Sequence, residues 1–250
     1  TKDYEADELE VFKSMALKGL IYRGLKPVHW SPSSETALAE AEIEYQDVVS
    51  DSIYVAFTVT KGNDKVPVGS KFVIWTTTPW TLPANLGISV HPRFVYGLYE
   101  SSVGNLVLLD DLAESFTKET GIEVKKRSSF KGGELDLLET KHPLYDRISL
   151  VMVGDHVTAE TGTGAVHTAP GHGMEDFIIG QKYGLDVFCP VNERGVFTDE
   201  ETRYAGLFYE SANSVILEHL KAVNALLGAK KITHSYPHDW RTNKQLIFRA

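Results

Sequence analysis

The chain has 250 residues, enough for one large domain or for one domain with appendages. Its hydrophobic content of 42% and charged content of 24% are those of a soluble globular protein, and its longest apolar runs are too short to span a membrane. The formal net charge of −9 argues against a stand-alone nucleic-acid binder driven by charge. It does not exclude RNA binding if another part of a larger molecule supplies the affinity.

Cysteine content and the terminal residues bear on the cellular compartment. The single cysteine, Cys189, excludes an internal disulfide and suits a reducing compartment. The first residues are acidic and polar and form no secretory signal, so we expect a cytoplasmic location. Because the chain lacks an initiator Met and ends at Ala250 without a tail, we expect a piece of a longer protein.

The first part of the chain is predicted to connect rather than to form a core. Apolar residues at helical spacing predict a helix over residues 4–18. Residues 26–34 contain two prolines and are expected to be extended, and residues 35–46 are rich in Ala and Glu but only weakly amphipathic. We therefore assign residues 1–48 to a segment that leads into the domain.

Short β-forming runs dominate the rest of the chain. Strands are predicted over residues 53–59, 71–77, 87–90, 94–99, 105–109, 122–130, 148–153 and 163–168. Helices are predicted from Asp110 or Asp111 to Gly121, from Met174 to Tyr183, and from a cap at Ser211 along an apolar stripe that reaches Leu227.

This pattern predicts a mainly β, α+β fold, a closed or nearly closed β-barrel with peripheral helices. The regular βαβ alternation of a doubly wound sheet is absent. We assign the barrel to residues 49–230 and residues 231–250 to a segment that leads out of it.

Residues 161–177 (TGTGAVHTAPGHGMEDF) are the most unusual stretch of the chain. Four glycines allow left-handed backbone or close approach to a ligand, and a proline stiffens the middle. Two histidines and two acids lie among them, namely His167, His172, Glu175 and Asp176. The two acids fall at a predicted helix start, where the helix dipole favours carboxylates. The alternative is a surface loop with ordinary polar residues, but loops this dense in titratable groups often carry sites.

Residues 75–85 (WTTTPWTLPAN) are the second unusual stretch. Three consecutive threonines at a strand end place hydroxyls on both faces, and Pro79 ends regular pairing. Such hydroxyls can donate to and accept from a substrate carbonyl, a ribose or water. Threonine also simply favours strands, so this run alone would not indicate a site.

Other types of site are not indicated. His167 and His172 are five residues apart with no thiolate nearby, so no metal site is predicted. Gly162-Thr163-Gly164 lacks the third glycine of the dinucleotide fingerprint and leads into a predicted strand. No serine or cysteine has the local signature of a nucleophile.

The two stretches together resemble the editing domain, or connective insertion, of isoleucyl-tRNA synthetase. The resemblance covers essentially the whole chain, because residues 26–45 resemble the segment that enters this insertion and residues 234–250 the segment that leaves it. Relatives for leucine and valine carry Thr-Thr-Arg-Pro where this chain has Thr76-Thr77-Thr78-Pro79. They carry Ala-His-Asp where it has Gly171-His172-Gly173, so both differences favour isoleucine. One departure is Gln245-Leu246, where the family usually shows Pro-Val.

The resemblance implies hydrolytic proofreading. A synthetic site separates valine from isoleucine by only about 1–3 kcal/mol, a magnitude for which this enzyme family is itself the standard example. A second site would therefore deacylate mischarged valyl-tRNA(Ile) by water attack on the ester and exclude isoleucine by size. The ATP-binding signatures of the parent enzyme are absent from this chain, so we expect no aminoacylation.

The implied partners and cofactors follow from this role. The partners would be the acceptor end of tRNA(Ile) carrying valine and the remainder of the parent synthetase, with no membrane and with the chain as a monomer. No cofactor is expected in this domain, whereas the parent would use ATP and Mg. Two alternatives stay open: a leucyl- or valyl-type editing domain, and a non-catalytic β-barrel that binds the tRNA acceptor end.

The resemblance also implies roles for individual residues. Asp176 matches an acid that would bind the substrate ammonium by a charge-assisted hydrogen bond. His167 would limit side-chain size, orient water, or do both, and we rank these roles above general-base chemistry. Thr77 would act with its neighbours on the adenosine end and the water. The further substrate-binding candidates are Thr76, Thr78, Asn85, Trp75, Trp80 and His172, where the two tryptophans are as well suited to the core and His172 to shaping the loop.

Overall fold

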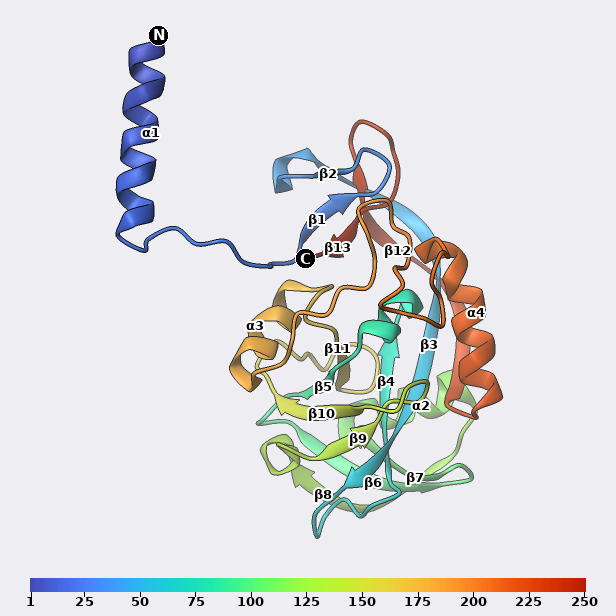
Figure 1. Ribbon diagram of the computed structural model, residues 1–250. Coiled ribbons are helices and arrows are strands. Elements are labelled where there is room, and N and C mark those ends of the chain that lie inside the picture. Colours follow the sequence, from blue (N-terminus) through green and yellow to red (C-terminus); the bar gives the residue numbers. More distant parts are fainter.

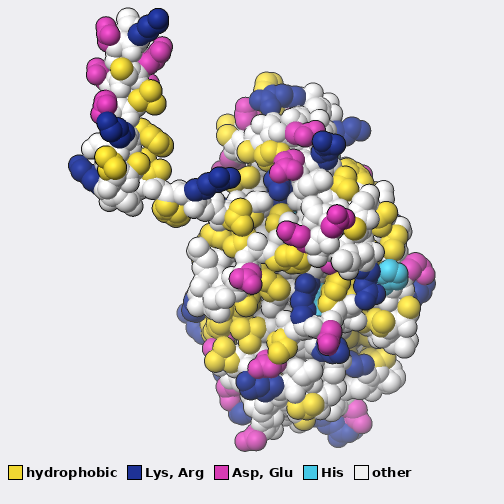
Figure 2. Space-filling model, viewed as in Figure 1, with side chains coloured by type: hydrophobic (Ala, Val, Ile, Leu, Met, Phe, Trp, Pro, Cys, Tyr) yellow, Lys and Arg dark blue, Asp and Glu magenta, His cyan; other side chains and the backbone are white.

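The computed structural model describes residues 1–250. Figure 1 shows a body of strands with short helices at its periphery, and one helix standing apart at the end of an extended linker. That helix, α1 (Lys2–Leu17), confirms the prediction over residues 4–18, and none of its residues is buried. In Figure 2 its hydrophobic side chains gather along one side, beside acidic and basic ones. No helix of the chain is long and apolar enough to cross a membrane.

Ten strands form the main sheet. Their bounds are β3 (Ile43–Lys61), β4 (Lys71–Thr76), β5 (Gly87–Val90), β6 (Val95–Ser101), β7 (Gly104–Leu109), β8 (Val124–Lys131), β9 (Glu139–Lys141), β10 (Ile148–Val153), β11 (Ala165–Thr168) and β12 (Leu226–Asp239). The hydrogen-bonded order is β11-β5-β10-β9-β3-β4-β7-β6-β8, with β12 also paired to β3. Pairs β5–β10 and β4–β7 are parallel and the others antiparallel. Each predicted strand is present, whereas β9 and β12 were not predicted.

The mainly β fold with a few helices is confirmed, but a closed barrel is not established. The hydrogen-bonded path is open, with β11 at one end and β8 at the other. Across the gap, the Thr163 hydroxyl donates to the carbonyl oxygen of Val73 in β4, and the Leu109 amide donates to the Thr163 carbonyl at 2.9 Å. These isolated bonds join β11 to its neighbours without a continuous ladder.

The core follows the period-two alternation of the strands. In β3, the side chains of Ile53, Val55, Phe57 and Val59 enter the main core, while Tyr54 enters a smaller one on the opposite face. Helix α2 (Ala113–Thr120) covers that smaller core, to which it contributes Ala113 and Phe116. The sheet is therefore buried on both faces near its centre.

A long two-stranded ribbon carries the chain into and out of the body. Strands β3 and β12 pair from Ile43 opposite Asp239 to Val55 opposite Leu226. The boundaries assigned at residues 48 and 230 both fall inside this ladder, so the leading and trailing segments leave the body as one ribbon. The domain division itself stays a prediction.

The second long helix differs from its prediction at both ends. Helix α4 (Tyr209–Ala222) begins two residues before Ser211, which does not cap it, and the predicted stripe to Leu227 is wrong beyond Val223. Asn224 adopts a left-handed φ of 54°, and the chain then turns into β12. Asn tolerates this conformation, and the turn ends the helix where the ladder to β3 begins.

A small three-stranded sheet lies at the end of the ribbon where Ile43 pairs with Asp239. Its order is β13 (Ile247–Arg249), β1 (Val28–Ser31) and β2 (Thr36–Ala37), all antiparallel. Asp239, fully buried, accepts hydrogen bonds of 2.6 Å from the hydroxyls of Ser31 and Ser34 and one of 2.8 Å from the Arg241 amide. Burial opposes ionisation of this carboxyl, but the hydrogen bonds outweigh it and lower its pKa to about 2.

Candidate functional site

The threonine run forms a buried turn. Strand β4 ends at Thr76, and a 3-10 stretch, η2 (Pro79–Ala84), follows with all six of its residues buried. Pro79 occupies the first helical position, where its fixed φ is favourable and no amide hydrogen is needed. The Thr78 amide donates to the Thr76 hydroxyl at 3.1 Å, and the Thr81 hydroxyl donates to the Thr78 carbonyl at 2.9 Å. These local bonds replace the strand ladder and fix the turn.

Side chains from elsewhere hold η2 in place. His142 Nε2 donates to the Leu82 carbonyl at 2.9 Å, and Arg147 donates to the Pro83 carbonyl. The Trp80 amide donates to Asn213 Oδ1 of α4 at 2.9 Å. The turn is therefore fixed by two other parts of the fold, the β9–β10 connection and α4.

His167 lies on β11 with both ring nitrogens bonded. Asn85 Nδ2 lies 2.8 Å from the Gly87 carbonyl and 2.9 Å from His167 Nδ1. Because a carbonyl only accepts, the amide nitrogen of Asn85 must face it, so His167 Nδ1 is also an acceptor. The ring proton is then on Nε2, which donates to the Thr81 hydroxyl at 2.8 Å. Asn85 Oδ1 accepts from the Ser149 hydroxyl at 2.7 Å, so its amide is fully used.

Burial keeps this imidazole neutral. It lowers the pKa of His167 to about 3, with smaller contributions from the nearby His172 and Arg147. The only lone pair of the neutral ring faces Asn85. In this arrangement the ring of His167 is held from both nitrogens and has no free lone pair with which to take a proton.

The Gly/His loop joins β11 to α3 (Met174–Tyr183), a helix whose predicted bounds are confirmed. A side chain at Gly171 would collide with the carbonyl oxygen of Phe188, which explains the glycine. Asp176, in the first turn of α3, accepts from the Ala169 amide at 2.8 Å. Burial raises the pKa of this carboxyl to about 7, against the opposing effect of that hydrogen bond. A bound cation would stabilise its ionised form.

His172 connects three parts of the molecule. Its Nδ1 lies 2.9 Å from the Phe248 carbonyl of β13, and its ring meets Trp80 edge-on with 5.0 Å between centroids. Its Nε2 is buried without a partner, and burial lowers the pKa of the ring to about 4. This residue therefore ties the Gly/His loop to η2 and to the outgoing strand.

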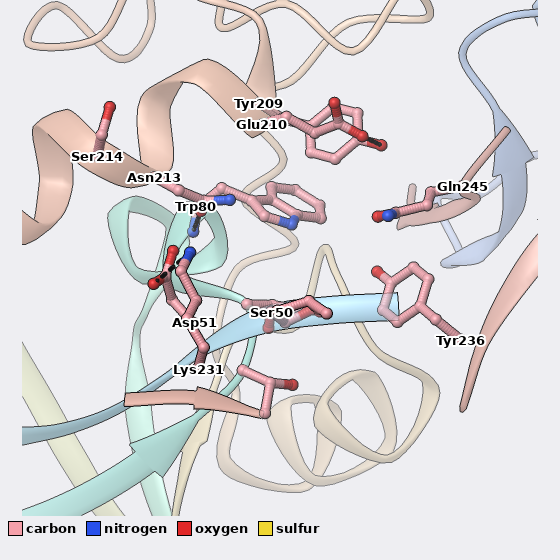
Figure 3. Close-up of a pocket in the computed structure, with 13 residues that line it drawn as sticks. Ser50, Asp51, Trp80, Tyr209, Glu210, Asn213, Ser214, Lys231, Tyr236 and Gln245 are labelled. Atoms are coloured by element: carbon pink, nitrogen blue, oxygen red, sulfur yellow. Dashed lines mark hydrogen bonds and ion pairs between the residues drawn. The ribbon is translucent and has the colours of Figure 1, made fainter. Parts of the chain in front are cut away.

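Two cavities flank the threonine turn. A cavity of about 230 Å³ is lined by Trp75, Thr76, Thr77, Thr158 and residues 161–166. A larger one, of about 430 Å³, lies between η2, β3, β12 and α4 (Figure 3). Thr77 lines both cavities, and its hydroxyl makes no hydrogen bond within the chain. Trp75 donates from Nε1 to the Ser52 hydroxyl at 2.7 Å, which fixes its ring in the wall of the smaller cavity.

The structure joins some of the predicted site residues in one network and leaves others outside it. Thr76, Thr78, His167 and Asn85 belong to one hydrogen-bonded network whose central member, Thr81, was not singled out from the sequence. Thr81 stands three residues after Thr78, a spacing that aligns side chains on a 3-10 turn and could have indicated it. Asp176 joins the same loop through Ala169, whereas Trp80 is only 4% exposed and packs as a core residue. No group of three or more His, Cys, Asp or Glu side chains is arranged to hold a metal ion.

Comparison with known proteins places this geometry in a family. The family profile described as "tRNA synthetases class I (I, L, M and V)" matches residues 1–245. The chain belongs to these class I synthetases. Isoleucine–tRNA ligase 1 of Oceanobacillus iheyensis is 57% identical over 251 residues, covering 100% of this chain and 27% of that protein. Isoleucine–tRNA ligase of Bacillus cytotoxicus is 57% identical over 248 residues, covering 99% and 27%. The synthetase chain thus spans about 27% of the length of these curated relatives.

Solved structures agree at the level of the fold. A crystal structure described as GlLeuRS-CP1 matches with a TM-score of 0.56 at 16% identity, covering 72% of this chain and 99% of that one. The editing domain of the P. falciparum cytosolic leucyl-tRNA synthetase matches with a TM-score of 0.54 at 10% identity and the same coverage. The resemblance to isoleucyl-tRNA synthetase drawn from the two motifs is therefore confirmed, and the fold is that of an editing domain.

Proposed function

We propose that this chain is the hydrolytic proofreading domain of an isoleucine–tRNA ligase, which deacylates valyl-tRNA(Ile) and spares isoleucyl-tRNA(Ile). One observation carries the proposal. The network around Thr81 uses every side-chain hydrogen-bonding group of His167 and Asn85, while the Thr77 hydroxyl and one oxygen of Asp176 make no hydrogen bond within the chain. A rigidly held imidazole, a free hydroxyl and a carboxyl with an unused oxygen together suit an aminoacyl ester.

Each available group has a task in this reaction. Asp176 keeps one oxygen on the Ala169 amide and offers the other to the α-ammonium, whose charge favours the ionised carboxyl. Thr77, with Thr76 and Thr78, binds the adenosine end and the attacking water. Water adds to the ester carbonyl, the ribose hydroxyl leaves, and valine and tRNA are released.

His167 acts as the wall of the side-chain pocket. Its ring is held from both nitrogens, so it cannot swing aside for a larger side chain without losing two buried hydrogen bonds. Trp75, in the wall of the smaller cavity, offers aromatic surface to the adenosine, whereas Trp80 packs against His172, which fixes the loop that carries Asp176. We also propose that the sheet works as a nearly closed barrel, with Thr163 joining β11 to β4.

The remaining expectations belong to the same proposal. Hydrolysis uses no cofactor in this domain, and ATP and Mg act in the remainder of the parent synthetase. The partners are the acceptor end of tRNA(Ile) and that remainder, and the chain works as a cytoplasmic monomer.

A deacylation assay tests the proposal. Valyl-tRNA(Ile) is offered to the chain and to its Asp176→Ala variant, with Glu175→Ala, exposed on the same helical turn, as a matched control. We expect hydrolysis by the chain and by the control, unaffected by EDTA, and a nearly complete loss in Asp176→Ala because the ester is no longer positioned. Hydrolysis only of mischarged tRNA(Leu) or tRNA(Val) would favour the leucyl- or valyl-type alternative. Binding without hydrolysis would favour the non-catalytic one.

A further inference from the structure

The larger cavity beside the threonine turn has no role in the hydrolysis just described. Its lining comes from five parts of the chain and includes three aromatic rings, those of Trp80, Tyr209 and Tyr236. Figure 3 shows Gln245 and Tyr236 pointing toward the indole of Trp80, with Glu210 on the helix above them. The cavity therefore combines flat apolar surface with converging polar groups, as in sites for planar polar ligands.

Several of these polar groups lack partners. Glu210 accepts one hydrogen bond, from the Tyr209 hydroxyl at 3.1 Å. The Gln245 amide, the Tyr236 hydroxyl and the Asn213 amide nitrogen make no hydrogen bond within the chain, whereas Asn213 Oδ1 is used by the Trp80 amide. The cavity thus offers one strong acceptor and several donors to a ligand.

The charges in the cavity indicate what it would not bind. Lys231 is paired with Asp51 at 2.7 Å, so Glu210 carries the charge that no cation neutralises. Burial and then the nearby Glu210 raise the pKa of Tyr236 to about 12, so this hydroxyl keeps its proton and can donate a hydrogen bond to a ligand. A phosphate would be repelled here, while a neutral ring that donates from an amine would be attracted.

The position of the cavity indicates which ring that would be. Thr77 lines both this cavity and the smaller one, in which the threonine run would hold the terminal adenosine. Two cavities that share one wall suit two successive nucleotides of a single strand. Aromatic side chains such as Tyr236 can stack on such a base.

We propose that the larger cavity binds the cytosine base that precedes the terminal adenosine of tRNA, with Glu210 accepting from its exocyclic amine. The assignment rests on the proposed function, because it takes the tRNA acceptor end as the substrate. Carboxylates accept from the N4 amine of cytosine, and the amide nitrogens of Asn213 and Gln245 can donate to its N3 and O2. Uracil presents a carbonyl oxygen where cytosine has the amine, so Glu210 discriminates against it.

The test compares two acceptor-stem minihelix RNAs that end in CCA or CUA. Both carry valine through a non-hydrolysable amide on the terminal adenosine, and Kd is measured for the 250-residue chain, Glu210→Gln and Glu218→Gln. Glu218 lies on the same helix, is 75% exposed and does not line the cavity, so it is the matched control. We expect the unaltered chain and Glu218→Gln to bind the CCA form about tenfold more tightly. Glu210→Gln should reverse the preference, because its amide can donate to the carbonyl of uracil.

Three results would overturn the assignment: no preference by the unaltered chain, an equal effect of Glu210→Gln on both RNAs, or no binding of either RNA. The proposed function is tested separately with valyl-adenosine, an ester that has no preceding nucleotide. If the unaltered chain does not hydrolyse that ester or valyl-tRNA(Ile), the proofreading proposal fails while the base preference is still measured.

Discussion

Replacing Asp176 with asparagine should stabilise the protein while it removes the activity. The carboxyl is partly buried at the start of α3 with a pKa of about 7, against an ordinary value of 3.8. The folded state therefore binds a proton at Asp176 that the unfolded chain releases, so the contribution of this carboxyl to stability is greatest below pH 3.8 and is lost as the pH rises toward 7. Asparagine keeps an oxygen for the Ala169 amide and has no charge to bury.

The size of the effect follows from the two pKa values. The gap between 3.8 and about 7 corresponds to about 4 kcal/mol, at about 1.4 kcal/mol per pKa unit. Because the carboxyl is partly exposed, solvent screening reduces the expected gain to about 2–3 kcal/mol at pH 8. At pH 5 the unfolded carboxyl has already released most of its protons while the folded one keeps them, so part of the penalty remains and the gain should be about 1.5 kcal/mol.

Urea unfolding of the chain, Asp176→Asn and Glu175→Gln at pH 5 and pH 8 measures these differences as shifts of the midpoint. Glu175 is exposed on the same turn and is only a minor cause of the raised pKa of Asp176, so its variant should show a much smaller pH-dependent gain. If Asp176→Asn is less stable than the unaltered chain at both pH values, Asp176 is an ordinary helix N-terminal acid. An equal gain at both values would refute the argument from burial of the charge.

Three further outcomes follow from the site and the ribbon. His167→Ala should raise the ratio of isoleucyl-tRNA(Ile) to valyl-tRNA(Ile) hydrolysis about tenfold, equivalent to about 1.4 kcal/mol; if both rates fall and the ratio does not change, His167 positions water instead. Thr77→Ala should reduce single-turnover deacylation less than Asp176→Ala, since one hydrogen bond is worth about 0.5–1.5 kcal/mol, and the reverse order would contradict the assigned roles. Asp239→Asn should lower the free energy of unfolding by about 2 kcal/mol at pH 7, judged from the pKa of about 2. That difference is expected to disappear as the pH falls below 3.8 toward 2, and a pH-independent loss would argue against it.

Local sequence was sufficient for elements whose ends are marked by their own residues. The strand over residues 148–153 and the helix over residues 174–183 were predicted with their observed bounds, because β-rich runs and the stop at Gly184 are local signals. Strand β12 was missed because the helical apolar pattern continues to Leu227, past the end of α4. What makes a strand of residues 226–239 is pairing with β3, about 180 positions earlier, which no local pattern contains.

The candidate site was also predictable from the sequence only in part. Its two motifs identified Thr77, His167 and Asp176 as candidates, but the sequence could not say which of their atoms are free. That depends on Ser149 and Thr81, which saturate Asn85 and the ring of His167 from other strands and turns. The second cavity was not foreseen at all, because Glu210 and Tyr236 belong to elements that carry no motif.

Which side-chain atoms are already hydrogen-bonded distinguishes the residues that hold the site in shape from those available to bind the substrate. His142, Arg147 and Asn213 hold the backbone of η2, and the amide of Asn85 orients His167, so these hydrogen bonds are spent on the structure of the site. Such groups fix geometry before the substrate arrives, and their removal should misplace the ester rather than delete a contact. In the proposed reaction Asp176 is the opposite case, since burial makes its charge costly and the substrate ammonium would offset that cost. A site built this way gains its selectivity from the rigid part and its affinity for the aminoacyl group from the unsatisfied part. Variants of the residues that hold the site rigid should therefore change the ratio of isoleucyl-tRNA to valyl-tRNA hydrolysis. Variants of Asp176 should lower both hydrolysis rates together.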